Sequence, residues 1–167
     1  MGYAVIRTDL MTGTDVNAGL VSFKYMGADG KTATALENGS VVKIENLMEG
    51  ERELWLAGNV AADTPIDQIV VVAGVEMMYD ERKRNLEDYI NEAGKPVRGY
   101  RLHKGHDTFS VTKEAFAEGS DLTVGNAVEL TAGTKMKASA SATGTKIGKI
   151  IAKEKAGRYE YYVVHVE

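Results

Sequence analysis

The chain has 167 residues, with 20 basic and 24 acidic side chains, no cysteine and an apolar fraction of 44%. This length suits one domain, or two small ones, and the ordinary apolar fraction excludes a disordered or fibrous class. Mild acidity without a basic block argues against nucleic acid or an anionic membrane as partner, because both require clustered Lys and Arg. Without cysteine, disulfides, thiolate metal sites and a cysteine nucleophile are excluded.

The N-terminal stretch MGYAVIRTDLMTGTD has neither the basic region nor the apolar core of a signal peptide. The longest apolar run, residues 69–74, is far shorter than a membrane span. We therefore expect a protein made in a cytoplasm that does not enter a membrane.

The balance of 18 glycines against 2 prolines, with Val, Ile, Thr and Tyr common, predicts many short strands joined by glycine turns. We expect a mainly β fold, a small barrel or sandwich of short antiparallel strands, with one or two short helices. Residues 1–35 are rich in Gly, Thr, Asp and Asn and alternate poorly. They are expected to form an extended N-terminal arm or a loosely packed segment, and residues 36–167 a single β-rich domain.

In the first part of that domain, strands are expected at residues 40–47, 53–59 and 67–80, the last bent or bulged at Gly74. Residues 81–94 are the best helix candidate, because Asp80 can cap the start and Gly94 can end it before Pro96. The many charges in this segment make a partly solvated loop the alternative. The methionines at positions 48, 77 and 78 are expected to fill gaps in the core.

The second part reads as further short strands, with one helical turn between the second and the third. The expected strands are residues 97–102, 107–111, 126–133, 134–141, 147–154 and 158–167, and the helical turn is residues 112–119.

Segments 39–74 and 125–157 share a weak pattern. Val42 aligns with Val128 in the first pair of strands, and Val70 aligns with Ile151 in the second. An internal duplication and convergent strand patterns both fit; we favour convergence, because such short patterns recur by chance.

The stretch ATGTKIGKII, residues 142–151, superficially resembles a phosphate-binding loop. A P-loop requires four residues between its glycines and a Ser or Thr after the Lys, whereas Gly144 and Gly148 have only three residues between them and Lys149 is followed by Ile150. The stretch is therefore predicted to be a turn followed by a strand, in which glycine sets the backbone geometry.

His103, His106 and Asp107 form the best candidate metal site, since two imidazoles and a carboxylate supply three ligands. A polar hairpin tip is the interpretation we favour, because the histidines flank a Lys-Gly turn. No carboxylate is set apart in an apolar stretch, and no Gly-x-Ser-x-Gly elbow occurs. We predict neither enzymatic activity nor a cofactor.

Two long stretches carry a resemblance. They are NGSVVKIENLMEGERELWLAGN with VVVAGVEMMYDERKRNLEDYINEAGKPVRGYRLHKGHDTFSVTKEAF, and VGNAVELTAGTKMKASASATGTKIGKIIAKE, with its Gly-x-x-Val-x-Leu opening and Ile-Gly-x-Ile close. In these stretches the chain resembles the β-rich decoration (cement, or auxiliary head) proteins of tailed bacteriophages of Gram-positive hosts.

The resemblance implies a non-enzymatic virion protein on the capsid surface, which binds the major capsid protein and stabilises the expanded head. Other copies of the same chain are a further expected partner. No family site residue transfers, because the family has no invariant chemical motif to map. An N-terminal arm suits such a role, since it can cross a subunit boundary or extend a capsid sheet. The candidate arm contacts are Tyr3, Val5, Ile6, Arg7, Leu10 and Met11.

Three alternatives remain open at this point. A tail, baseplate or head-fibre protein would bind host sugars through exposed aromatics. A metal-dependent enzyme would retain metal at His103 and His106, and a small-ligand barrel would enclose an apolar cavity.

Overall fold

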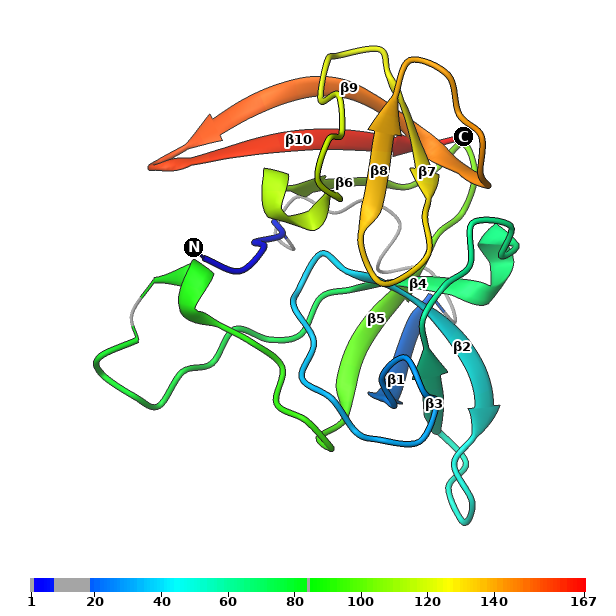
Figure 1. Ribbon diagram of the computed structural model, residues 1–167. Helices are drawn as coiled ribbons and strands as arrows, with labels where there is room; N and C mark the ends of the chain where they lie inside the picture. Colours follow the sequence, from blue (N-terminus) through cyan, green and yellow to red (C-terminus); the bar gives the residue numbers. More distant parts are fainter. Residues whose placement is uncertain (1, 8–18, 84) are drawn as a thin grey trace.

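The computed structural model describes residues 2–7, 19–83 and 85–167, in which ten strands form two sheets. Figure 1 shows a small barrel below and a second sheet above it. The barrel strands are β1 (Leu20–Tyr25), β2 (Val41–Leu47), β3 (Leu54–Gly58), β4 (Ile69–Val72) and β5 (Val97–Arg101). The others are β6 (Thr108–Val111), β7 (Ala127–Leu130), β8 (Met136–Ser139), β9 (Lys146–Ala156) and β10 (Tyr159–Val166). The short 3₁₀ turns are η2 (Ile66–Gln68), η3 (Leu86–Asp88) and η4 (Lys113–Ala115). The mainly β prediction is confirmed.

The barrel closes in the order β1-β3-β2-β4-β5, and its closing contact differs from the sequence prediction. β1 pairs with β5 in antiparallel fashion but with β3 in parallel, so the strands are not all antiparallel. A parallel pair needs a long crossover, which the chain between β1 and β3 provides by passing through β2. The interior is filled by side chains, with Phe23, Val42 and Val70 fully buried.

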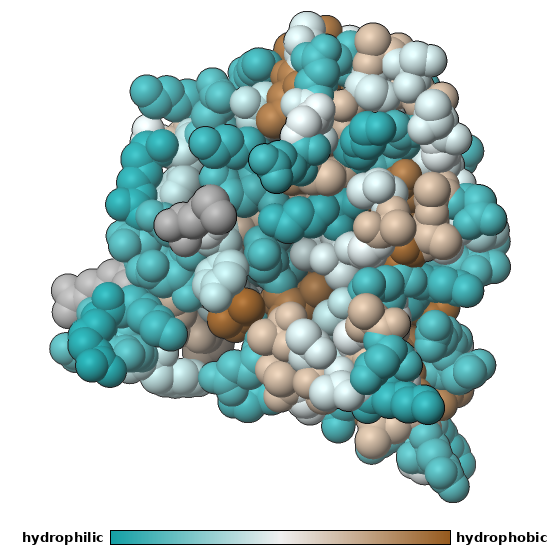
Figure 2. Space-filling model, viewed as in Figure 1, coloured by the Kyte–Doolittle hydropathy of each residue, from teal (hydrophilic) through white to brown (hydrophobic). Residues whose placement is uncertain are grey.

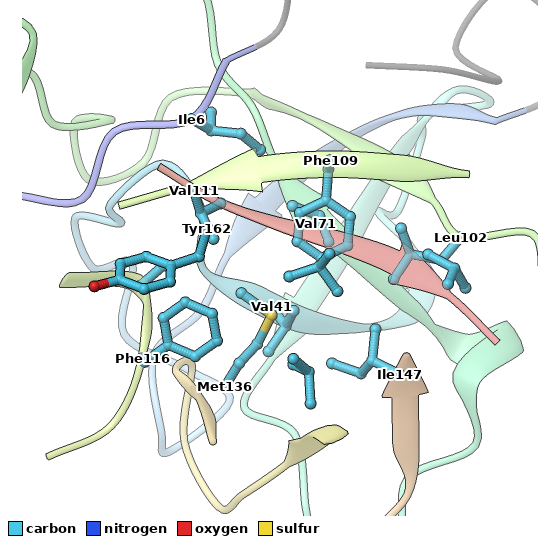
Figure 3. Packing of buried hydrophobic residues seen from close by; sticks show 14 of the residues in the cluster. Ile6, Val41, Val71, Leu102, Phe109, Val111, Phe116, Met136, Ile147 and Tyr162 are labelled. Atoms are coloured by element: carbon cyan, nitrogen blue, oxygen red, sulfur yellow. The ribbon is translucent and has the colours of Figure 1, made fainter. Parts of the chain in front are cut away.

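Two apolar clusters lie on opposite faces of β4. Val70 and Val72 point into the barrel, whereas Ile69 and Val71 belong to the cluster between barrel and second sheet. Figure 3 shows that second cluster, in which Val41 and Val71 of the barrel face Phe109 of the second sheet. A strand covered on both faces needs an uninterrupted apolar run, and this explains the sequence IVVV.

The second sheet has the order β6-β10-β9-β7-β8, and all its ladders are antiparallel. Just after β6, Phe116 makes a single parallel bridge to Met136 of β8. This bridge connects the segment after one edge strand, β6, to the other edge strand, β8. It is parallel, like the pairing of β1 with β3 that closes the barrel.

Residues 20–101 (the first half) and 108–166 (the second half) therefore repeat one strand order: β1-β5-β4-β2-β3 corresponds to β6-β10-β9-β7-β8. We align the halves by matching Val42 of β2 with Val128 of β7, as the sequence suggested. Val42 faces Val70 and Val128 faces Gly148, so Val70 corresponds to Gly148. The alignment of Val70 with Ile151 was therefore wrong by three positions.

Two sequence predictions about local structure need correction. β1 is a barrel strand, so the structure does not separate an arm over residues 1–35 from a domain over 36–167. The described residues 81–83 and 85–94 do not form the expected helix: they contain only the single turn η3 and an isolated bridge at Asn91, with Tyr89 extended at φ −79° and ψ 134°. The apolar stripe of this segment is too narrow to bury a helix face, so contacts with the rest of the fold decide its path. No helix in the described part of the chain is long and apolar enough to cross a membrane.

Candidate docking surface

The two halves differ most in the connection between their fourth and fifth strands. In the second half, β9 and β10 stay paired as far as Ala156 and Tyr159 and are joined by a tight turn at Gly157, whose φ is 60°. In the first half, β4 ends at Val72 and β5 begins at Val97, and the described residues between them, 73–83 and 85–96, form a long projection that we call the β4–β5 loop. Figure 1 shows it extending to the left of the barrel.

The β4–β5 loop begins with a strip of exposed apolar side chains. Val75, Met77 and Tyr79 are 56%, 60% and 89% exposed, while Glu76 and Met78 between them are half-buried. Figure 2 shows a largely hydrophilic face on which hydrophobic residues form small separate areas. Because exposed loop residues often carry binding functions, this strip is our candidate contact surface for another macromolecule.

A buried amide network holds the base of the loop. The Asn38 side chain donates to the Gly74 carbonyl at 3.0 Å and accepts the Gly74 N–H at 2.8 Å. Asn91 donates to the Asn38 side-chain oxygen at 2.9 Å and to the Leu36 carbonyl, also at 2.9 Å. A Cβ at Gly74 would lie 2.1 Å from the Asn91 oxygen, so only glycine fits beside the network.

A second contact holds the far end of the loop against the β9–β10 hairpin. Glu87 forms an ion pair with Arg158 and accepts a hydrogen bond from the Tyr159 hydroxyl. The hydrogen bond from Arg158 lowers the pKa of Glu87 to about 2. The Glu87 carbonyl also accepts the Tyr3 N–H at 3.0 Å, so the N-terminal segment is held in the same place. The loop is thus fixed at both ends, while its apolar strip stays exposed.

Between these attachments the loop lines a half-open cavity of about 490 Å³. It is lined by Met77, Met78, Tyr79, Asp80, Lys83, Asp88, Tyr89, Ile90, Asn91, Glu92, Lys95, Pro96 and Val97. The Tyr89 hydroxyl donates to the Asn91 side-chain oxygen at 3.1 Å and thereby connects the cavity wall to the buried network.

The glycine-rich stretch at 142–151 holds an anion after all, but the anion belongs to the protein. Glu129, 1% exposed, accepts the backbone N–H of Gly144 at 2.6 Å and that of Thr143 at 2.5 Å. Burial opposes ionisation, yet these two N–H groups outweigh it and lower the pKa of Glu129. Lys137 lies 3.9 Å away on the neighbouring strand. The site therefore stabilises the second half rather than binding a nucleotide.

The candidate metal residues lie at a turn, where the backbone N–H groups of His106 and Asp107 both donate to the His103 carbonyl. Asp107 accepts the His103 backbone N–H at 2.7 Å, and its same carboxylate oxygen lies 3.1 Å from Nδ1 of the His103 ring. Its other oxygen is buried without a hydrogen-bond partner. Among the described residues, no three His, Cys, Asp or Glu side chains are grouped so as to hold a metal ion, and His106 does not complete such a group.

The N-terminal candidates are placed differently from the prediction of an arm. Val5 and Ile6 are 1% and 3% exposed and belong to the protein's own core: Ile6 bridges Val111 of β6. They are therefore not available for an external contact. The Arg7 N–H donates to the Ser110 carbonyl, and the Arg7 guanidinium lies 5.7 Å from the Tyr161 ring centroid.

Of the remaining N-terminal candidates, Tyr3 keeps 40% of its surface exposed, beside Glu87 of the β4–β5 loop. Leu10 and Met11 lie outside the described residues.

The residues that sequence reasoning missed are those of the exposed strip. Met77 was expected in the core and Tyr79 within a strand, since the stretch VVVAGVEMMY stays mostly apolar past Gly74, with Glu76 as its only charged residue. The sequence did hold one sign that residues after Gly74 would leave the sheet. The equivalent strand β9 is followed at once by the glycine turn that leads into β10, whereas Tyr79 is followed by a run of charged residues and no such turn. The chain matches no protein-family model, and comparison with curated proteins and with solved structures finds no similar one.

Proposed function

We propose that this protein is a non-enzymatic structural component of a phage virion. It docks on the outer surface of the capsid, against the major capsid protein, and stabilises the expanded head. The β4–β5 loop is the docking element. The observation that carries this proposal is the exposed strip Val75, Met77 and Tyr79, on a loop that replaces a tight turn of the equivalent half.

Two further features support the proposal that the β4–β5 loop docks on the capsid. The loop is held at its base by buried amides and at its far end by Glu87, so it loses little conformational freedom on binding. The resemblance described above covers this loop and both halves of the chain. Because a capsid offers many equivalent sites, even modest affinity for each would stabilise the assembled shell by mass action.

The first test is capture of partners by the tagged full-length chain from lysate of its source, with mass spectrometry of the retained proteins. Recovery of assembled shells and the major capsid protein is expected. Recovery of tail components, or of no large assembly, would overturn the capsid assignment.

The second test assigns the surface. The doubly substituted Met77→Asp, Tyr79→Asp protein should sediment with purified shells at least tenfold less than the wild type. The matched control, Leu47→Asp with Ile151→Asp, places the same charges at residues that are 42% and 44% exposed elsewhere. Equal binding by the two variants would remove the loop from the interface while leaving the capsid assignment intact.

A further inference from the structure

The N-terminal segment, residues 2–7, contacts both the β4–β5 loop and the second half of the chain. On the side of the loop, the Tyr3 N–H donates to the Glu87 carbonyl at 3.0 Å. Gly2 packs so closely against the same residue that a Cβ at Gly2 would lie 2.9 Å from the Glu87 Cβ. Both contacts are made at the short turn η3, the far end of the loop.

The rest of the segment is anchored in the core. Ala4, Val5 and Ile6 are 2%, 1% and 3% exposed. The Val5 N–H donates to the Thr112 hydroxyl at 3.1 Å, and the Val5 carbonyl accepts the Thr112 N–H at 2.9 Å. Figure 3 shows Ile6 beside Val111 of β6, to which it forms a bridge. The segment therefore covers the edge of β6 and is held there by the second half.

The segment also reaches the base of the loop. The Ala4 N–H donates to one carboxylate oxygen of Glu37 at 3.1 Å, and the other oxygen lies 3.8 Å from the Lys135 amine. The neighbouring Leu36 exchanges two backbone hydrogen bonds with Asn91, each of 3.0 Å. The contacts of residues 2–7 thus extend from the base of the loop to its far end.

Of the attachments at the far end, the backbone contact is the stiffer. The side-chain pair of Glu87 with Arg158 is partly solvated, and such pairs contribute little. The Tyr3 N–H, in contrast, belongs to a residue that directly precedes the buried Ala4. Because Tyr3 cannot follow a displaced loop, any movement of the far end must break the hydrogen bond to Glu87.

We infer that residues 2–7 are a strap that positions the β4–β5 loop. With the strap docked on β6, the turn η3 is held in place. With the strap released from Glu87, the far end of the loop moves while the two sheets stay folded. The inference rests on the proposed function only for its consequence, that a released loop docks less well on a capsid. The strap itself can be tested in the free protein.

The test is amide hydrogen exchange, followed by NMR, in the ¹⁵N-labelled full-length protein with Tyr3→Pro or Tyr3→Ala. Both variants lose the same side chain, but only proline also removes the N–H that donates to Glu87. Exchange at Asp88 and Tyr89, whose N–H groups close η3, should be at least tenfold faster in Tyr3→Pro than in Tyr3→Ala. Exchange at Asn91, bound at the base of the loop, should be the same in both variants.

A variant remote from the loop tests the coupling. Thr112→Val keeps the shape of the side chain and removes the hydroxyl that accepts the Val5 N–H. It should raise exchange at Asp88 and Tyr89 at least threefold, although Thr112 belongs to the second half. Equal exchange at these two amides in Tyr3→Pro and Tyr3→Ala, or no change in Thr112→Val, would overturn the inference.

Sedimentation with purified shells separates the strap from the docking role of the loop. Tyr3→Pro should bind shells at least threefold less than Tyr3→Ala. Faster exchange in η3 together with equal shell binding would support the strap and remove the loop from the interface. Equal exchange in the two variants would overturn the strap, whatever their binding to shells.

Discussion

The first half, residues 20–101, and the second half, residues 108–166, share one strand order and nearly one register, but they use equivalent positions differently. Lys43 of β2 is half-buried, while its counterpart Glu129 of β7 is fully buried and held by backbone N–H groups. Asn38 is buried beneath the β4–β5 loop, while its counterpart Val124 is 49% exposed. The two halves therefore share a strand arrangement, and they differ in which polar side chains are buried and in what those side chains hold in place.

The clearest departure concerns size on the two central strands. Val70 of β4 lies beside Gly99, where a Cβ would come within 2.7 Å of Val70 and 2.9 Å of Phe23. In the second half the sizes are exchanged, because Gly148 is equivalent to Val70 and Val164 is equivalent to Gly99. A valine and a glycine thus occupy these two equivalent positions in opposite order in the two halves.

The largest expected effect on stability comes from adding a side chain at Gly148. A Cβ there would lie 1.9 Å from the His165 carbonyl oxygen, a backbone atom that cannot move without parting β9 from β10. Gly148→Ala should lower the free energy of unfolding by more than about 3 kcal/mol, measured by urea denaturation. Gly58→Ala is the control, because its Cβ would meet only the Glu45 carboxylate at 3.2 Å. Equal stability of the two variants would contradict the proposed close approach.

The next effect concerns the buried carboxylate of the second half. Glu129→Ala leaves the Thr143 and Gly144 N–H groups without their acceptor and should cost about 3 kcal/mol of unfolding free energy. Lys43→Ala at the equivalent position of the first half should cost far less, since Lys43 is half-buried and makes no such contact.

The same carboxylate gives stability a defined pH dependence. Because the pKa of Glu129 is lower in the folded than in the unfolded protein, its contribution is complete above the ordinary value of 4.5. It is lost as the pH falls below 4.5 through the folded-state pKa. The stability gap between wild type and Glu129→Gln should therefore close on acidification, as followed by urea denaturation at each pH. If the difference in unfolding free energy stayed the same at every pH, the Glu129 side chain would stabilise the protein by packing and not by its charge.

An intermediate effect is expected at the base of the β4–β5 loop. Asn38→Ala removes the partner of both Gly74 and Asn91 and should lower the free energy of unfolding by about 2 kcal/mol. Val124→Ala at the equivalent exposed position should change it by only a few tenths. If Asn38→Ala were equally mild, the amide network would not be what holds the loop.

The smallest effect is expected at the far end of the loop. Glu87→Gln should leave the midpoint of unfolding almost unchanged, since the ion pair with Arg158 is partly solvated. It should still raise amide hydrogen exchange several-fold at Tyr3 and along the loop. Glu92→Gln, which breaks an exposed pair on the same loop, is the control and should leave exchange at Tyr3 as in the wild type.

Much of the strand content was predictable, because it depends on patterns local to each strand. Alternation placed Val42 and Ile44 together on one face of β2, and both do line the barrel interior. β1 was missed because LVSFKY follows a polar glycine-rich stretch, and its burial comes from pairing with the distant strands β3 and β5. The helix expected over 81–94 failed for a related reason: helical spacing of a few apolar residues does not outweigh the amide network and the Glu87 contact, which join residues far apart in the chain.

The candidate docking surface was likewise predictable only in part. The apolar character of Val75, Met77 and Tyr79 is plain in the sequence, but hydrophobicity alone does not tell a buried strand from an exposed strip. The strand predicted after the turn at Gly144 is present, yet nothing local indicated that Glu129 would accept the N–H groups of Thr143 and Gly144.

By itself, therefore, the sequence determined the class of fold, the position of most strands and the absence of cysteine chemistry, since these follow from composition and from short-range periodicity. Only the tertiary structure decided that the two halves repeat one strand order, that Val5 and Ile6 belong to the core, and that the β4–β5 loop projects. Each of these depends on which distant strands pair. Pairing is chosen by the burial of whole faces against one another, a property that no single segment of the chain carries.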